Sequence, residues 1–123
     1  MSGIVKDITG KAKENTFFRQ VLETSKNTQI VIMSIPPGGE IGEETHPDND
    51  QILYLVEGSG KVILNGEEQA YEKGDLVLVS AGTKHNFVNT GSEDLKIITT
   101  YSPPHHPQGT VHKTKQEAEA ANY

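Results

Sequence analysis

The sequence predicts an all-β protein, a β-sandwich or barrel of short strands. Alternating or β-branched apolar runs recur at regular spacing along residues 16–101, and turn residues separate them. Before residue 110 no segment has a convincing helical period. One short helix is expected near the C-terminus, where Thr114 and Glu117 form a capping box before an Ala/Glu-rich segment.

Turn signals divide the chain into strands and indicate where each strand ends. The Pro-Pro-Gly-Gly run at 36–39 stops a β-branched strand, and the Asn65–Gly66 pair is a strong signal for a two-residue hairpin. The expected strands are residues 16–24, 29–35, 51–57, 61–64, 67–71, 76–79, 85–88 and 95–101. The side chains expected to be largely buried include Ile30, Ile32, Leu53, Leu55, Val77, Val79 and Ile98.

Length, cysteine content and net charge limit the kinds of domain and partner that the chain can have. At 123 residues and without cysteine, the chain is expected to form one domain, 1–123, whose core needs no disulfide. A net charge of −6 with no basic cluster argues against nucleic acid and anionic membranes as partners. No apolar run approaches the roughly 18 residues that span a bilayer, and no leader segment is evident. We therefore expect a cytoplasmic protein. A homodimer is expected because a small barrel leaves sheet edges to protect.

Four polar side chains are expected to converge inside the barrel. Glu44 and His46 are two positions apart, so in a strand both side chains leave the same face. Turn residues 47–50 then reverse the chain, and Gln51 opens the next strand opposite that pair. His85 follows a second polar turn and supplies the fourth side chain.

These two clusters resemble the two signature motifs of the cupin superfamily, whose members are small double-stranded β-helix barrels. Motif one corresponds to residues 38–58 and motif two to residues 74–89, leaving 102–123 as a tail with a short helix. The matching positions are Gly38, Glu44, His46, Gln51 and Gly58 in the first motif, and Gly74, Ser80, Gly82, His85 and Asn89 in the second. Serine replaces the usual proline of motif two, and glutamate replaces the first histidine of motif one.

The resemblance implies a metal site formed by Glu44, His46, Gln51 and His85, where cupins usually have three histidines and a glutamate. This set would provide two imidazoles, one carboxylate and one amide oxygen. Two histidines and a carboxylate suit Fe(II), and Zn, Mn and Ni are also suited. With a single anionic ligand, a divalent ion leaves the site net positive, which favours a small anionic molecule in the open positions.

Other interpretations stay open at this stage. Each of the four residues alone has an ordinary structural explanation, and together they could belong to a degenerate cupin that keeps its pocket without a metal. The Pro/His-rich segment 101–112 either lines the pocket mouth or forms a surface tail. Candidate proton donors or orienting residues are His105, His106 and Tyr54, although alternation from Gln51 points Tyr54 outward.

Three classes of function follow from the resemblance. The first is a metal-dependent enzyme for a small polar or anionic substrate, such as an isomerase of a sugar or sugar acid. Some pectin-degradation cupins are similar in using glutamine as a ligand. The second is an Fe(II)-dependent dioxygenase. The third is a non-catalytic cupin that binds a small molecule.

Overall fold

The computed structural model describes residues 2–121, which form ten strands and two short helices. Every strand pair is antiparallel. The elements are α1 Ile8–Glu14, β1 Arg19–Thr24, β2 Gln29–Ile35, β3 Glu44–Thr45, β4 Asp50–Glu57, β5 Ser59–Leu64, β6 Glu67–Glu72, β7 Leu76–Val79, β8 Lys84–Asn89, β9 Leu95–Ser102, β10 Val111–His112 and α2 Lys115–Ala121. No helix in this described part of the chain is long and apolar enough to cross a membrane.

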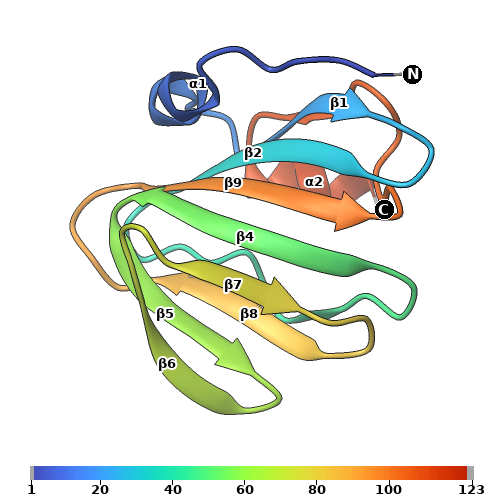
Figure 1. The fold of residues 1–123 in the computed structure, drawn as a ribbon. Helices are drawn as coiled ribbons and strands as arrows, with labels where there is room; N and C mark the ends of the chain where they lie inside the picture. Colours follow the sequence, from blue (N-terminus) through green and yellow to red (C-terminus); the bar gives the residue numbers. More distant parts are fainter. Residues whose placement is uncertain (1, 122–123) are drawn as a thin grey trace.

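The strands form two sheets that face each other (Figure 1). The larger sheet has the order β10-β1-β2-β9-β4-β7, and the smaller has the order β3-β8-β5-β6. Strands that are neighbours in a sheet are mostly distant in sequence, because the chain crosses between the sheets at its turns. This is the predicted double-stranded β-helix, and both sheets contribute inward-facing side chains to one core.

Alternation along the strands decides which side chains reach this core. In β4, Gln51, Leu53 and Leu55 point inward and are buried, whereas Ile52 and Tyr54 lie on the outer face. Of the predicted core residues, Ile32, Leu53, Leu55 and Val79 are buried. The other three, Ile30, Val77 and Ile98, are buried less completely.

The outer face of the larger sheet explains part of this difference. In β2 the inward-facing side chains are Val31 and Met33, while Ile32 packs on the other face with Ala12 of α1, next to Ile98. Helix α1 packs on this outer face, against β9, β4 and β2 (Figure 1). The expectation of no helix before residue 110 was therefore wrong.

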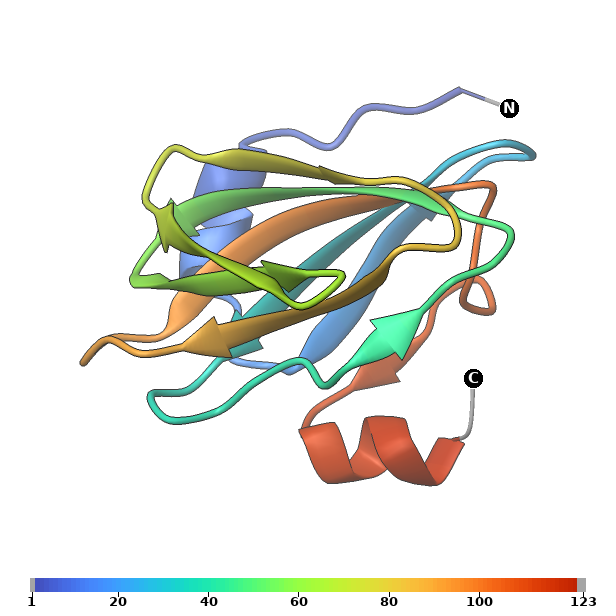
Figure 2. The same ribbon diagram turned by 90° about the horizontal axis from the view of Figure 1, so that it is seen from below.

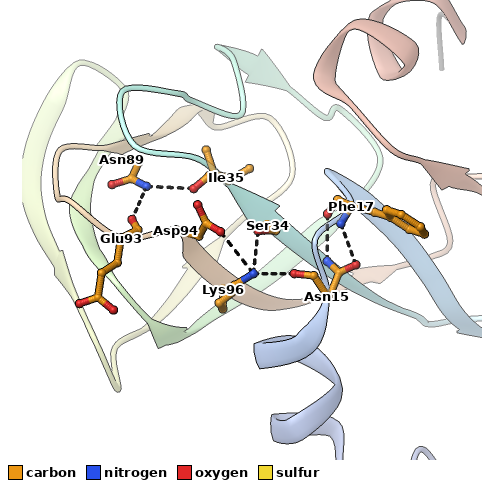
Figure 3. A network of polar contacts seen from close by, with 8 residues as sticks. All are labelled: Asn15, Phe17, Ser34, Ile35, Asn89, Glu93, Asp94 and Lys96. Atoms are coloured by element: carbon orange, nitrogen blue, oxygen red, sulfur yellow. Dashed lines mark hydrogen bonds and ion pairs between the residues drawn. The ribbon is translucent and has the colours of Figure 1, made fainter.

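Helix α1 has only seven residues, too few for a clear apolar period. It begins at Asp7, whose side chain accepts a hydrogen bond from the Gly10 amide. The buried side chain of Lys96 connects the end of this helix to the larger sheet by hydrogen bonds (Figure 3). The Lys96 Nζ atom donates hydrogen bonds to the Asn15 carbonyl at 2.6 Å and to the Ser34 hydroxyl at 3.0 Å.

Turn and cap chemistry agrees with the sequence at both predicted sites. Asn65 and Gly66 both have positive φ, as a type I′ hairpin between β5 and β6 requires. At the start of α2, the Thr114 hydroxyl accepts a hydrogen bond from the Glu117 amide, and Glu117 accepts one from the Lys113 amide. Helix α2 lies beside β10 and β3 (Figure 2), so the predicted C-terminal helix is confirmed and borders the site.

Candidate metal centre

Two strand ladders position the residues that the motifs single out. Glu44 on β3 is the Cα partner of His85 on β8, at the edge of the smaller sheet. Gln51 on β4 is the partner of Tyr101 on β9, in the middle of the larger sheet. His46 follows β3 as the chain turns from one sheet towards the other. Carboxylate, imidazole and amide groups therefore come from both sheets.

The structure brings Glu44, His46 and His85 together. One ligand atom from each lies within 4.8 Å of the others, which is a spacing that one metal ion could bridge. The His46 Nε2 atom is 3.8 Å from the Glu44 carboxylate, and the His46 and His85 rings are 5.2 Å apart between centroids. Both histidines are buried and Glu44 is half-buried.

Hydrogen bonds leave the correct atoms available for a metal. The Nδ1 atom of His85 is 2.9 Å from the Thr83 carbonyl, to which it donates, so in the neutral imidazole the lone pair is on the Nε2 atom. Gln51 donates from its amide nitrogen to the Thr99 hydroxyl at 3.1 Å. Within residues 2–121, the buried Gln51 Oε1 and His46 Nε2 atoms have no hydrogen-bond partner. An amide oxygen and, in its Nδ1–H tautomer, the His46 Nε2 atom are both groups that a divalent metal accepts as ligands, so the chemistry of this donor set fits a metal.

Burial also keeps the site ready to ligate. Burial lowers the pKa of His46 to about 4, with further lowering from His105, His85 and Arg19, so His46 is neutral at pH 7. Burial raises the pKa of Glu44, and the positive Arg19 partly opposes this shift. A bound cation would favour the charged carboxylate further.

The Pro/His-rich segment lines the site and is no surface tail. The Gln29 side chain anchors it by accepting from the amides of His105 and His106 and donating to the His106 carbonyl. The His105 ring lies 4.4 Å from the His46 ring and stacks on Tyr101 at 5.5 Å. His106 is buried against both His105 and Tyr101.

All five histidines of the chain lie in one continuous series of ring contacts. The series runs in the order His85, His46, His105, His106 and His112. Tyr54, the third candidate orienting residue, is not near it. Its side chain is on the outer face of β4, 38% exposed, because it alternates with Leu53 and Leu55. Tyr54 is therefore not a pocket residue.

Sequence reasoning missed two further side chains at the site, Arg19 and Tyr101. Arg19 is buried at the start of β1, and its guanidinium lies 3.2 Å from the His112 ring. Tyr101 is buried between the histidine rings and within hydrogen-bonding reach of Arg19 and Gln51. Burial raises the pKa of Tyr101 to about 12, so the phenol stays protonated. The one available signal was the alternation of β1, which places Arg19 on the same face as Val21.

Two surface cavities each border one residue of the Glu44, His46 and His85 cluster. One, of about 440 Å³, lies over β8 and includes His85, Asn65 and Lys84 in its wall. The other, of about 400 Å³, lies between β3 and α2 and includes Arg19, Glu44 and Lys115. Small molecules therefore have room at both the His85 side and the Glu44 side.

Comparison with known proteins identifies the family. The model of the cupin domain matches residues 31–101, which include both motifs up to the end of β9. The chain belongs to the cupin family. The resemblance seen in the sequence is thereby confirmed, together with the double-stranded β-helix.

Several proteins are similar to this chain in sequence or in structure. The uncharacterized protein YrkC of Bacillus subtilis is 43% identical over 124 residues, covering 95% of this chain and 66% of YrkC. This chain thus spans slightly less than two thirds of YrkC. The crystal structure of BH2720 from Bacillus halodurans superposes with a TM-score of 0.94 at 40% identity, covering 97% of this cupin and 95% of BH2720. KdgF from Halomonas sp. superposes with a TM-score of 0.66 at 26% identity, covering 71% of this chain and 78% of KdgF.

Proposed function

We propose that this cupin binds one divalent transition metal, Fe, Zn, Mn or Ni, through Glu44, His46, Gln51 and His85, and isomerises a small anionic substrate such as a sugar acid. The proposal is carried by the clustering of Glu44, His46 and His85 and by two buried atoms, Gln51 Oε1 and His46 Nε2, that have no hydrogen-bond partner within residues 2–121. Leaving such atoms unpaired is costly, and a cation is the group that satisfies them together.

The charge of the donor set supports an anionic substrate. Glu44 is the one carboxylate among the four proposed ligands, because Gln51 is neutral. A divalent ion would keep one uncompensated positive charge in a largely apolar core. When bound, the metal would supply Lewis-acid polarisation of a substrate carbonyl or enol oxygen.

His105 is the residue best placed to move a proton. Its ring lies between His46 and Tyr101 on a half-buried segment, and burial lowers its pKa, so the imidazole is neutral and able to accept a proton. The neutral Tyr101 phenol would orient the substrate by donating a hydrogen bond. The comparison with KdgF, named in Dickeya dadantii as a pectin degradation protein, supports a sugar-acid substrate.

One alternative activity has a specific structural basis. Glu44, His46 and His85 are two histidines and a carboxylate within 4.8 Å, the type of ligand set found at Fe(II) oxygenase sites. An oxygenase would consume oxygen and work only with iron, whereas an isomerase would work anaerobically with several divalent metals. Oxygen uptake with Fe(II) and candidate acids separates the two. The non-catalytic binding cupin predicts ligand binding with neither turnover nor oxygen uptake.

Elemental analysis of protein purified without chelators tests the metal. About one equivalent of a transition metal is expected in the wild-type protein, none in His85→Ala, and partial loss in Gln51→Ala, since a neutral amide binds metal more weakly than an imidazole.

NMR time courses with uronates and keto acids then test isomerisation, and His105→Ala should lose turnover while it keeps the metal. Wild-type protein that neither retains nor takes up metal would leave the metal-free cupin as the correct interpretation.

A further inference from the structure

Arg19 is a buried cation that forms no ion pair with any of the described residues. It is 5% exposed, and its Nε atom has no hydrogen-bond partner within residues 2–121. No carboxylate of the same described residues lies within ion-pair distance of its guanidinium. A buried guanidinium without an ion-pair partner is costly, so binding of an anion beside it would be favourable.

The surroundings of Arg19 connect it to the proposed metal ligands. Tyr101 lies within hydrogen-bonding reach of both Arg19 and Gln51, and the charge of Arg19 acts on Glu44 and His46. His112 holds one side of the guanidinium at 3.2 Å, and the Phe18 ring lies 5.2 Å from its central carbon. These contacts hold the guanidinium in place, and its Nε donor remains without a hydrogen-bond partner within residues 2–121.

The cavity between β3 and α2 gives small molecules access to Arg19 and Glu44. Its volume is about 400 Å³, which is sufficient for a small organic acid. The other charged groups in its wall are already paired. Lys115 pairs with Glu119 at 3.8 Å, and Glu43 pairs with Lys84 at 3.4 Å. Arg19 and Glu44 are therefore the charges that a ligand would meet.

We propose that Arg19 binds an acid group of the ligand, and that the site selects a small dianion such as a dicarboxylate over a monoanion. The inference rests on the proposed metal site. A divalent ion with one carboxylate ligand keeps one positive charge, and Arg19 adds a second. One acid group of the ligand would occupy an open metal position, and the other would receive the Arg19 fork from the α2 side.

Calorimetry with three ligands of nearly equal shape tests this selection. Malonate, malonamate and malonamide carry two, one and no negative charges. The Mn²⁺-loaded wild type is expected to bind malonate about ten-fold or more tightly than malonamate, since charge-assisted hydrogen bonds are roughly twice as strong as neutral ones. Arg19→Gln should reduce this preference to about two-fold or less. Arg19→Lys should retain part of it, because lysine keeps the charge without the fork.

Lys113→Gln is the matched control, because it removes an exposed cation just before α2 that does not line this cavity. It should leave the malonate preference unchanged. Mn²⁺ binding, followed separately by electron paramagnetic resonance, should be equal in wild type and Arg19→Gln. Equal wild-type affinity for malonate and malonamate would overturn the inference, as would a preference that survives in Arg19→Gln. The comparison of malonate with malonamate in the wild type needs no variant, so it tests the inference even if Arg19→Gln fails to fold.

Failure of the metal site itself gives a different pattern. If the wild type binds no Mn²⁺, the proposed function is wrong, and the metal-free protein tests Arg19 directly. Malonate or malonamate binding that Arg19→Gln abolishes and Lys113→Gln retains would then support anion binding by Arg19. Absence of binding of either acid to the metal-free wild type would overturn it.

Discussion

Glu44 on β3 lies directly opposite His85 on β8 in the same ladder, although the two residues belong to different sequence motifs. Backbone pairing thus fixes the separation of a carboxylate and an imidazole. His46 is added by the turn that follows β3, and its ring reaches 5.2 Å from the His85 ring. A site held by paired strands in this way is organised in advance of ligand binding.

The first prediction concerns this pair. Glu44→Gln removes the one carboxylate of the proposed ligand set, so its metal affinity should fall by about 100-fold or more. Glu43→Gln is the control, since Glu43 is the adjacent exposed carboxylate and pairs with Lys84. It should bind metal as the wild type does. Isothermal titration with Mn²⁺ and Zn²⁺ measures both, and equal losses in the two variants would mean that Glu44 is not a ligand.

The second prediction concerns the neutral ligand. Gln51→Glu would add a carboxylate at a buried position and remove one positive charge from the loaded site. Metal should dissociate more slowly in the presence of a chelator, while small carboxylates should bind about ten-fold more weakly. Titration of both proteins with the same panel of acids measures the change. Equal affinities would show that the charge of the site does not select its ligand.

The spacing of the motifs was sufficient to predict that Glu44, His46 and His85 converge, whereas Gln51 as a fourth ligand stays a prediction. In each of the two motifs, the glycines mark where strands end and so indicate which side chains lie at those ends. The observed pairing of Glu44 with His85 and of Gln51 with Tyr101 agrees with these positions. Arg19 could not be found in this way. Its role depends on β1 pairing with β2 and β10, and no local pattern encodes such distant pairings. Helix α1 was missed because its stability comes from packing on Ile32 and Val56 and not from its own periodicity.

The third prediction is that the expected homodimer forms through the edge of the larger sheet. Strand β7 ends that sheet, and its outward side chains Leu76 and Leu78 are 62% and 63% exposed. They pair across the ladder with Tyr54 and Ile52, which are also exposed. A second copy related by a two-fold axis would cover this surface with the same residues.

Light scattering at high micromolar concentration tests the dimer. The wild type should have the mass of two chains, and the double variant Leu76→Glu/Leu78→Glu should have the mass of one. Val111→Glu is the control, because Val111 is an exposed apolar residue on β10 at the opposite edge of the sheet. A monomeric wild type, or a dimer that survives the double variant, would contradict this interface.

The fourth prediction is that the metal-free protein loses stability as the pH falls below about 6.5. The pKa of His46 is about 4 in the folded protein, against 6.5 for an ordinary histidine. Between these values the unfolded chain binds more protons, so the free energy of unfolding rises with pH. The contribution of neutral His46 to the free energy of unfolding is complete above pH 6.5 and is lost as the pH falls through 4. For His46 alone it is on the order of 3 kcal/mol, at about 1.4 kcal/mol per pKa unit.

Neighbouring groups determine how steep this dependence is. Burial also lowers the pKa values of His105, His106 and His112, that of His106 to about 2, so all three act in the same direction. Glu44 acts in the opposite direction, because its raised pKa stabilises the folded state only at low pH. Urea unfolding at pH 5.0 and 7.5, with a chelator to remove metal, should therefore give a lower midpoint at pH 5.0. His46→Gln should make the dependence shallower, and an unchanged pH dependence in that variant would show that His46 is not held neutral by burial.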